Sequence, residues 1–151
     1  MIRKDAVVAW LDVEGRTAQD IEGEEGVAWH IVVSFPSPDG PSTHIIAPED
    51  GEYLLIRRGT NVAERHRKAL LALDEQSFRT FKFNLLRDLL LSGVQYRLLL
   101  QEDHNLSAFS MDTILRGADV TRHQFYEALQ RVHDATLLAV VHVRHVAGEA
   151  T

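Results

Sequence analysis

The residues best suited to chemistry are two histidines near the end of the chain. His142 and His145 stand at i and i+3 in a segment with helical periodicity, a spacing that can bring two imidazole rings to one metal ion. Histidines near a helix C-terminus are also favoured because the helix dipole stabilises their positive charge. We prefer the dipole explanation and predict no metal site, with His142 and His145 as the candidate ligands if there is one.

Two further histidines and two charged stretches could also bind ligands. His30 and His44 belong to neighbouring predicted strands and could face each other, but we prefer to interpret them as polar members of a half-exposed sheet face. The acidic stretch Asp20–Gly26 could coordinate a hard cation, yet it lacks the alternation of a calcium loop, so a solvated loop is preferred. A basic group could hold a phosphate or an acidic segment, although a solvated helix face is the preferred interpretation. This group consists of Arg57, Arg58, Arg65, Arg67 and Lys68.

No catalytic motif is present in the sequence. There is no G-x-S-x-G nucleophile turn, no phosphate-binding glycine loop and no H-E-x-x-H metal motif. The chain also lacks cysteine, which excludes disulfides, thiol catalysis and thiolate metal sites. We therefore predict no catalytic residue and no cofactor.

Composition limits the class of partner. The chain has 151 residues, 45% of them hydrophobic, which suits one globular domain over residues 1–151. A formal net charge of −6 argues against binding to nucleic acid or to an anionic membrane surface. The N-terminus does not resemble a signal peptide, and no apolar run approaches the roughly 20 residues of a membrane span. We expect a cytoplasmic protein.

The spacing of apolar and turn residues predicts four helices and five strands. The helices are expected at residues 2–11, 61–73, 75–91 and 120–147, and the strands at residues 27–35, 43–47, 53–58, 94–101 and 106–115. Short connections favour antiparallel pairing. The prediction is an α+β domain with a five-stranded antiparallel sheet and helices packed on it, in the order α-β-β-β-α-α-β-β-α.

Several capping and turn residues support these boundaries. Thr121 and Gln124 have the spacing of a capping box at the start of the last helix, and Asp74 can cap the third helix. Asp50-Gly51 is expected to supply a positive φ in a tight hairpin turn. A strand over Val140–Val146, where β-branched residues crowd, is the competing interpretation of the last helix.

The helices carry more apolar residues than a single covered face requires. Both the helix over residues 75–91 and the segment over residues 137–141 are apolar on most sides. Such a surplus indicates a dimer contact or a partner surface, unless each helix is enclosed within the monomer. The candidate residues are Phe78, Phe81, Leu85, Leu86, Leu89, Leu90, Leu137, Leu138 and Val141.

The order of elements over Ile2–Ala147, together with the segment TRHQFYEAL at residues 121–129, resembles the type III secretion chaperone-like superfamily. That superfamily includes YbjN-like bacterial proteins and several families of unknown function. The resemblance implies a small homodimer that holds another polypeptide without catalysis. It also implies a dimer contact through residues 78–91 and 94–101. The additional helix at residues 61–73 and the long apolar last helix depart from the pattern of the superfamily.

The function expected from the sequence is that of a homodimeric, non-enzymatic chaperone-like or adaptor protein that binds another polypeptide. The alternatives are an enzyme that uses a small molecule or a metal, with His142 and His145 near a carboxylate, and a regulatory domain that senses a ligand.

Overall fold

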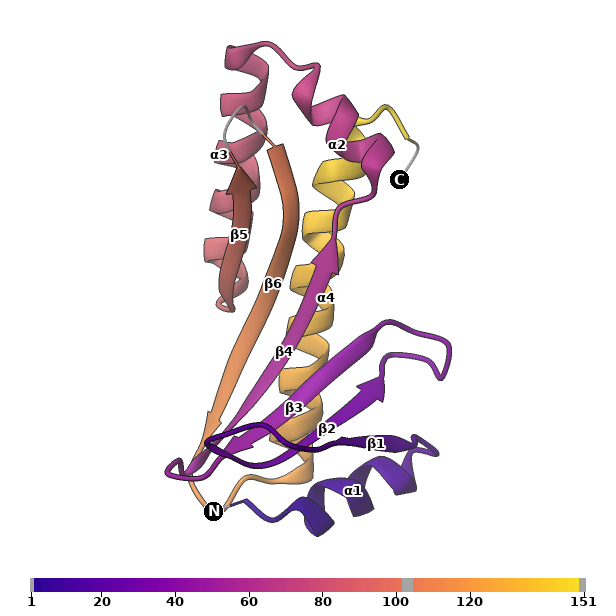
Figure 1. The fold of residues 1–151 in the computed structure, drawn as a ribbon, viewed down its shortest axis with the longest axis vertical. Coiled ribbons are helices and arrows are strands. Elements are labelled where there is room, and N and C mark those ends of the chain that lie inside the picture. Colours follow the sequence, from indigo (N-terminus) through magenta and orange to yellow (C-terminus); the bar gives the residue numbers. More distant parts are fainter. Residues whose placement is uncertain (1, 102–104, 150–151) are drawn as a thin grey trace. The chain divides into compact units, whose positions relative to one another are not determined.

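The computed structural model describes residues 2–101 and 105–149, which form an α+β fold (Figure 1). The helices are α1 (Lys4–Val13), α2 (Glu64–Leu71), α3 (Glu75–Ser92) and α4 (Arg122–Val146). The strands are β1 (Ala18–Ile21), β2 (Val27–Ser34), β3 (Ser42–Pro48), β4 (Tyr53–Asn61), β5 (Gln95–Gln101) and β6 (Asn105–Arg116). They form one sheet in the order β1-β2-β3-β4-β6-β5. The predicted α+β class is confirmed, whereas the predicted count of five strands is wrong because the sheet has six.

The additional strand is β1, in a stretch that the sequence analysis assigned partly to an acidic loop. β1 pairs antiparallel with β2, and Ala18 lies opposite Val33 while Ile21 lies opposite His30. Ala18 is half-buried and the other three residues of β1 are exposed. A strand that buries so little has no alternation of apolar and polar residues, and this alternation is the signal on which strand prediction depends.

The chain divides into two compact units. Unit 1 contains residues 1–58 and 112–133, and unit 2 contains residues 59–111 and 134–151. The backbone therefore passes from one unit to the other within β4, within β6 and within α4.

The core of unit 1 forms between one face of its strands and two helices. Alternate residues of β3 and β4 are buried, as the period of a strand requires, and in β2 the buried residues are His30, Ile31 and Val33. The helix α1 contacts the first turns of α4, where the rings of Trp10 and Phe125 lie 5.6 Å apart and Tyr126 Oη donates to the carbonyl of Trp10 at 2.9 Å. The buried apolar residues are Val7, Leu11, Ile31, Val33, Ile45, Leu54, Ile56, Phe125, Leu129 and Val132.

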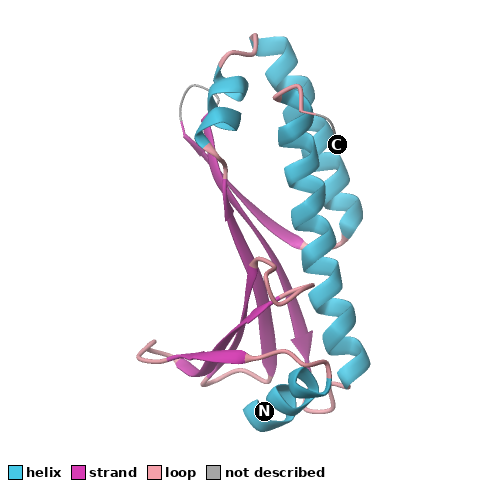
Figure 2. Cartoon of the chain, turned by 90° about the vertical axis from the view of Figure 1, so that its right-hand side faces the viewer, coloured by secondary structure: helices cyan, strands magenta, loops and turns pink. Residues whose placement is uncertain are grey.

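The core of unit 2 forms where α3 and the second half of α4 pack on one face of β5 and β6 (Figure 2). The helix α3 begins where Asp74 Oδ1 accepts a hydrogen bond from the backbone N–H of Ser77 at 2.9 Å, and it ends at Gly93 with φ +73°. The predicted cap at Asp74 is thus confirmed. The buried apolar residues include Leu70, Phe78, Phe81, Leu85, Leu89, Phe109, Ala139 and Val143.

The last helix is the longest element of the chain, with 25 residues. Its predicted capping box is present, because the backbone N–H of Gln124 donates to Thr121 Oγ1 at 3.3 Å and the N–H of Thr121 donates to Gln124 Oε1 at 2.9 Å. The helix continues to Val146, so the competing strand over Val140–Val146 is wrong. Helix α2 is shorter than predicted, because β4 extends to Asn61 and α2 begins at Glu64.

One turn differs from the prediction in its backbone. Gly51 does not have a positive φ. A Cβ at this position would lie 2.4 Å from Pro48 Cγ and 2.6 Å from Tyr53 Cε1, so close approach of side chains explains the glycine. Across the described ranges, no helix is both long and apolar enough to cross a bilayer.

Candidate functional site

The outer face of α3 carries large apolar side chains that unit 2 does not cover. Phe83, Leu90 and Leu91 are 66%, 68% and 80% exposed, respectively. Phe83 and Leu90 are separated by two helical turns and therefore share one side of the helix. The nearby strand β5 lies at the end of the sheet order, so one of its edges has no neighbouring strand of this sheet. We call Phe83, Leu90 and Leu91 the α3 outer face.

The candidate surface residues predicted from the sequence divide between this face and the core. Phe78, Phe81, Leu85 and Leu89 are buried inside unit 2 and have no area to offer a partner. Leu86 and Leu138 are half-buried, and the exposed members of the set are Leu90, Leu137 and Val141. The set did not include Phe83 or Leu91. Residues 78, 81, 85 and 89 form the buried stripe of α3. Identifying this stripe from the sequence would have shown that Phe83 and Leu91 lie outside it.

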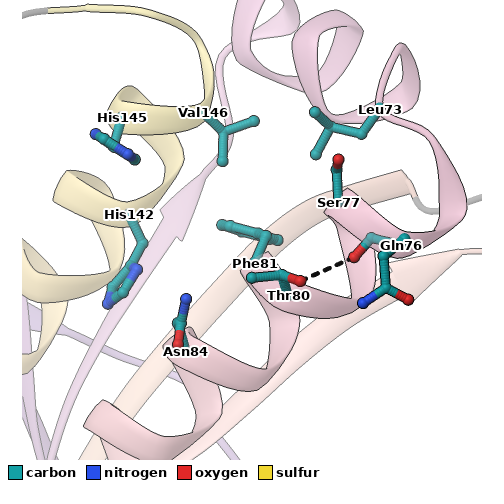
Figure 3. A pocket seen from close by; sticks show the side chains of 9 residues that line it. All are labelled: Leu73, Gln76, Ser77, Thr80, Phe81, Asn84, His142, His145 and Val146. Carbon is teal, nitrogen blue, oxygen red and sulfur yellow. Dashed lines mark hydrogen bonds between the residues drawn. The ribbon is translucent and has the colours of Figure 1, made fainter.

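A second feature of unit 2 is a cavity of about 360 Å³ between α3 and α4 (Figure 3). Apolar side chains line part of it, and polar side chains from both helices line the rest. Figure 3 shows Phe81 and Asn84 extending from α3 toward α4. The lining residues are Leu73, Gln76, Ser77, Thr80, Phe81, Asn84, His142, His145 and Val146.

The structure brings both C-terminal histidines to this cavity, and one of them is paired with a carboxylate. His142 Nε2 donates to Asp88 Oδ2 at 2.8 Å, and Arg87 Nε donates to Asp88 Oδ1 at 2.9 Å. Hydrogen bonds from Arg87 and then from His142 lower the pKa of Asp88 below its ordinary value, so this carboxyl group is ionised at neutral pH. Within the part of the chain that the structure describes, no three His, Cys, Asp or Glu residues are grouped so as to hold a metal ion.

Unit 1 contains a chain of three polar side chains on β2, β3 and the loop before β2. His30 Nε2 and His44 Nδ1 lie 2.9 Å apart, and His30 Nδ1 lies 2.9 Å from Glu24 Oε2. The two histidines therefore face each other, which was the less favoured interpretation of the sequence, and His30 is only 5% exposed. Burial lowers the pKa of His44, the positive charges of His30 and Arg57 lower it further, and Glu24 opposes them.

The two basic residues of β4 each have partners within unit 1. Arg57 and Arg58 are consecutive in a strand and point to opposite faces of the sheet. Arg57 binds Asp112 through two hydrogen bonds of 2.9 Å. Arg58, 1% exposed, donates to Thr43 Oγ1, to the carbonyl of Phe35 and to His133 Nδ1. Burial lowers the pKa of this guanidinium.

The remaining members of the predicted basic group lie on α2 and pair separately. Lys68 pairs with Glu64, Arg65 pairs with Glu149, and Arg67 donates to Asn105 Oδ1. The structure therefore gives no support to a phosphate site shared by these five side chains.

Comparison with known proteins places this arrangement of elements in a family. A family model described as "Uncharacterized conserved protein (DUF2299)" matches residues 3–143. The chain belongs to the DUF2299 family. A search of curated proteins finds no match to this DUF2299 member.

Two solved structures are similar to this DUF2299 member. One is the crystal structure of an uncharacterized protein from Methanothermobacter thermautotrophicus, with 21% identity and a TM-score of 0.85 over 94% of this chain and 96% of that chain. The other is the crystal structure of YbjN from E. coli, with 18% identity and a TM-score of 0.52 over 91% of each chain. At these identities the likeness concerns the fold. It supports the YbjN part of the expected resemblance, and neither description names a type III secretion chaperone.

Proposed function

We propose that this DUF2299 member is a cytoplasmic, non-enzymatic homodimer that acts as an adaptor for another polypeptide, and that its subunits associate through the α3 outer face. The observation that carries the proposal is the exposure of Phe83, Leu90 and Leu91, each more than half exposed on one helix. Large apolar patches on a small protein commonly mark an interface.

A two-fold axis suits the spacing of these residues. The midpoint between Phe83 and Leu90 falls between Leu86 and Arg87. Two antiparallel copies of α3 related by an axis at this point would set Phe83 of each subunit against Leu90 of the other. Arg87 would lie near the axis, where its ion pair with Asp88 in the same chain offsets its charge. The proposed contact is therefore self-complementary.

The expected affinity is moderate. Covering four such apolar side chains contributes about 6–12 kcal/mol in total, at about 1.5–3 kcal/mol each. Association costs about 4–15 kcal/mol in lost freedom of motion. The additional contacts of Leu86, Leu91 and the edge strand β5 would favour the dimer, so we expect a dissociation constant on the order of 1 μM.

Light scattering after size-exclusion chromatography tests the dimer directly. The wild-type protein should elute as a dimer at tens of micromolar. Phe83→Asp and Leu90→Asp should each raise the dissociation constant by at least about 100-fold, because each change removes two buried apolar contacts and places two carboxylates at the interface. The matched control is Val13→Asp on α1, since Val13 is 67% exposed and lies outside the α3 outer face.

Two results of the light-scattering experiment would contradict the proposed dimer. A wild-type protein that is monomeric at these concentrations contradicts the proposal, and so does a Leu90→Asp variant that remains as dimeric as the Val13→Asp control.

The adaptor role is tested by crosslinking the dimer to co-purifying polypeptides in host cells. An adaptor should lose these partners in Arg97→Glu or Leu99→Asp variants, in which the sheet face opposite α3 is altered, while the dimer remains. Leu99 is exposed there and lies beside Ala108 and Ser110.

A further inference from the structure

The cavity between α3 and α4 has a lining that is distinct from the α3 outer face. Phe81, Leu73 and Val146 supply apolar surface, while Asn84 and the two histidines supply polar groups. None of the side chains that line this cavity is Asp, Glu, Lys or Arg. Its volume of about 360 Å³ falls within the range of small-molecule sites.

The hydrogen bonds already present show which polar groups a ligand could use. Ser77 Oγ donates to Asp74 Oδ2 at 2.7 Å, and Thr80 Oγ1 donates to the carbonyl of Gln76 at 3.0 Å (Figure 3). These hydroxyl protons are therefore engaged. Among the described residues, the side chains of Asn84 and His145 make no hydrogen bond to the protein. Their N–H groups are open to a ligand.

His142 adds a polar ring that is held in place. Its Nε2 donates to Asp88, so its remaining nitrogen, Nδ1, is the one left for the cavity. The groups that face His142 are Asp88 and, through Asp88, Arg87 on α3, together with His145 on its own helix. With hydrogen on both nitrogens, this ring donates to Asp88 from Nε2 and to the cavity from Nδ1. The C-terminal end of α4 favours positive charge in the same region.

We propose that this cavity binds a small organic acid, with the carboxylate against His142, His145 and Asn84 and the apolar body against Phe81, Leu73 and Val146. Polar side chains from both helices line the site, and no lining side chain is a carboxylate that would repel the ligand. A ligand cation has no opposite charge to meet in this lining, and a fully apolar ligand would leave the donors unpaired. The inference does not depend on the homodimer, because Phe83 and Leu90 are not part of the lining.

Calorimetric titration with phenylacetate and phenylacetamide tests the proposal, because the two probes share an apolar ring and differ in charge. Phenylacetate should bind at least about ten-fold more tightly than phenylacetamide, because a carboxylate forms charge-assisted hydrogen bonds with the donors of this lining. Equal binding of the two probes, or no binding of either at millimolar concentration, overturns the proposal.

Three variants locate the site. His142→Gln should weaken the binding of phenylacetate by about ten-fold. Asn84→Leu should fill the cavity and abolish binding of both probes, while circular dichroism and the melting temperature confirm that the variant is folded. His123→Gln is the matched control, since its side chain is 83% exposed at the start of α4 and should leave binding unchanged. Unchanged phenylacetate binding in a folded Asn84→Leu variant would overturn the assignment to this cavity.

Discussion

Two neighbouring leucines of α3 provide a sharp test of the structure. Leu89 is 0% exposed and lies in the core of unit 2, whereas Leu90 is 68% exposed on the α3 outer face. The residues have the same side chain and adjacent positions in one helix. Truncation of each to alanine therefore compares burial alone, because the change in helix propensity is the same for both.

The expected magnitudes differ several-fold. Leu89→Ala should lower the free energy of unfolding by about 2–5 kcal/mol, because it removes buried methyl groups and leaves a cavity beside the Phe81 and Leu85 stripe. Leu90→Ala should change the stability of the monomer by no more than about 0.5 kcal/mol. Its effect should instead fall on association, since each dimer would lose two leucines from the interface. An Asp at position 89 should unfold the chain, so it cannot report on the dimer.

Urea denaturation followed by circular dichroism measures the comparison. The protein should be diluted below its dimer dissociation constant, because association raises the apparent stability with the logarithm of concentration. With a slope of about 1–3 kcal/mol per molar urea, Leu89→Ala should lower the midpoint by about 1–2 M. Equal losses for the two variants, or a larger loss for Leu90→Ala, would mean that α3 presents a different side to the sheet. In that case the proposed dimer contact would also be wrong.

Three further predictions follow from local features. Burial, and then the charge of His30, lowers the pKa of His44 in the folded chain, so the unfolded chain binds more protons. The free energy of unfolding should therefore have its full value above about pH 6.5 and should decline as the pH falls below it. Thermal denaturation should show a shallower decline for His44→Gln. Thr121→Ala removes the cap of α4 and should cost about 1 kcal/mol, and an unchanged melting temperature would contradict the capping box. Gly51→Ala should cost about 1–3 kcal/mol because its methyl group would meet Pro48, whereas a stabilising effect in urea would show that the turn has room.

The elements that sequence periodicity predicts well are those with one buried face and defined ends. The helix α3 has a cap at Asp74, a glycine at its C-terminus and a buried stripe, and its observed range of 75–92 differs from the prediction by one residue. The strands β3 and β4 alternate between buried and more exposed positions over most of their length. Where a residue type is required by both local conformation and burial, the sequence carries two agreeing signals.

The features that the sequence did not reveal depend on contacts that residue type alone does not specify. β1 exists because its backbone pairs with β2, and backbone pairing leaves little trace in residue type when the side chains remain exposed. Gly51 is explained by Pro48 and Tyr53 and not by its own φ. The predicted turn at residues 102–105 falls largely on residues 102–104, which lie outside the described residues.

The candidate sites show the same limit. Sequence spacing placed His142 and His145 on one part of a helix, but Asp88, the partner of His142, is 54 residues away in the chain. The facing of His30 and His44 likewise needs the register of β2 against β3, in which Val32 lies opposite His44. Residue type identified these histidines as chemically interesting, and only the register and packing determine what each one contacts.

The excess of apolar residues on α3 has a definite geometric origin. At about 100° per residue, the buried stripe of residues 78, 81, 85 and 89 and the exposed pair Phe83 and Leu90 fall on nearly opposite sides of the helix. The polar side chains of Gln76, Thr80 and Asn84 line the cavity from a third side. A count of apolar residues adds two separate stripes together and suggests one broad apolar face. A helix that served only the core of unit 2 would need the first stripe alone, so the second stripe requires its own explanation, which the proposed dimer contact would provide.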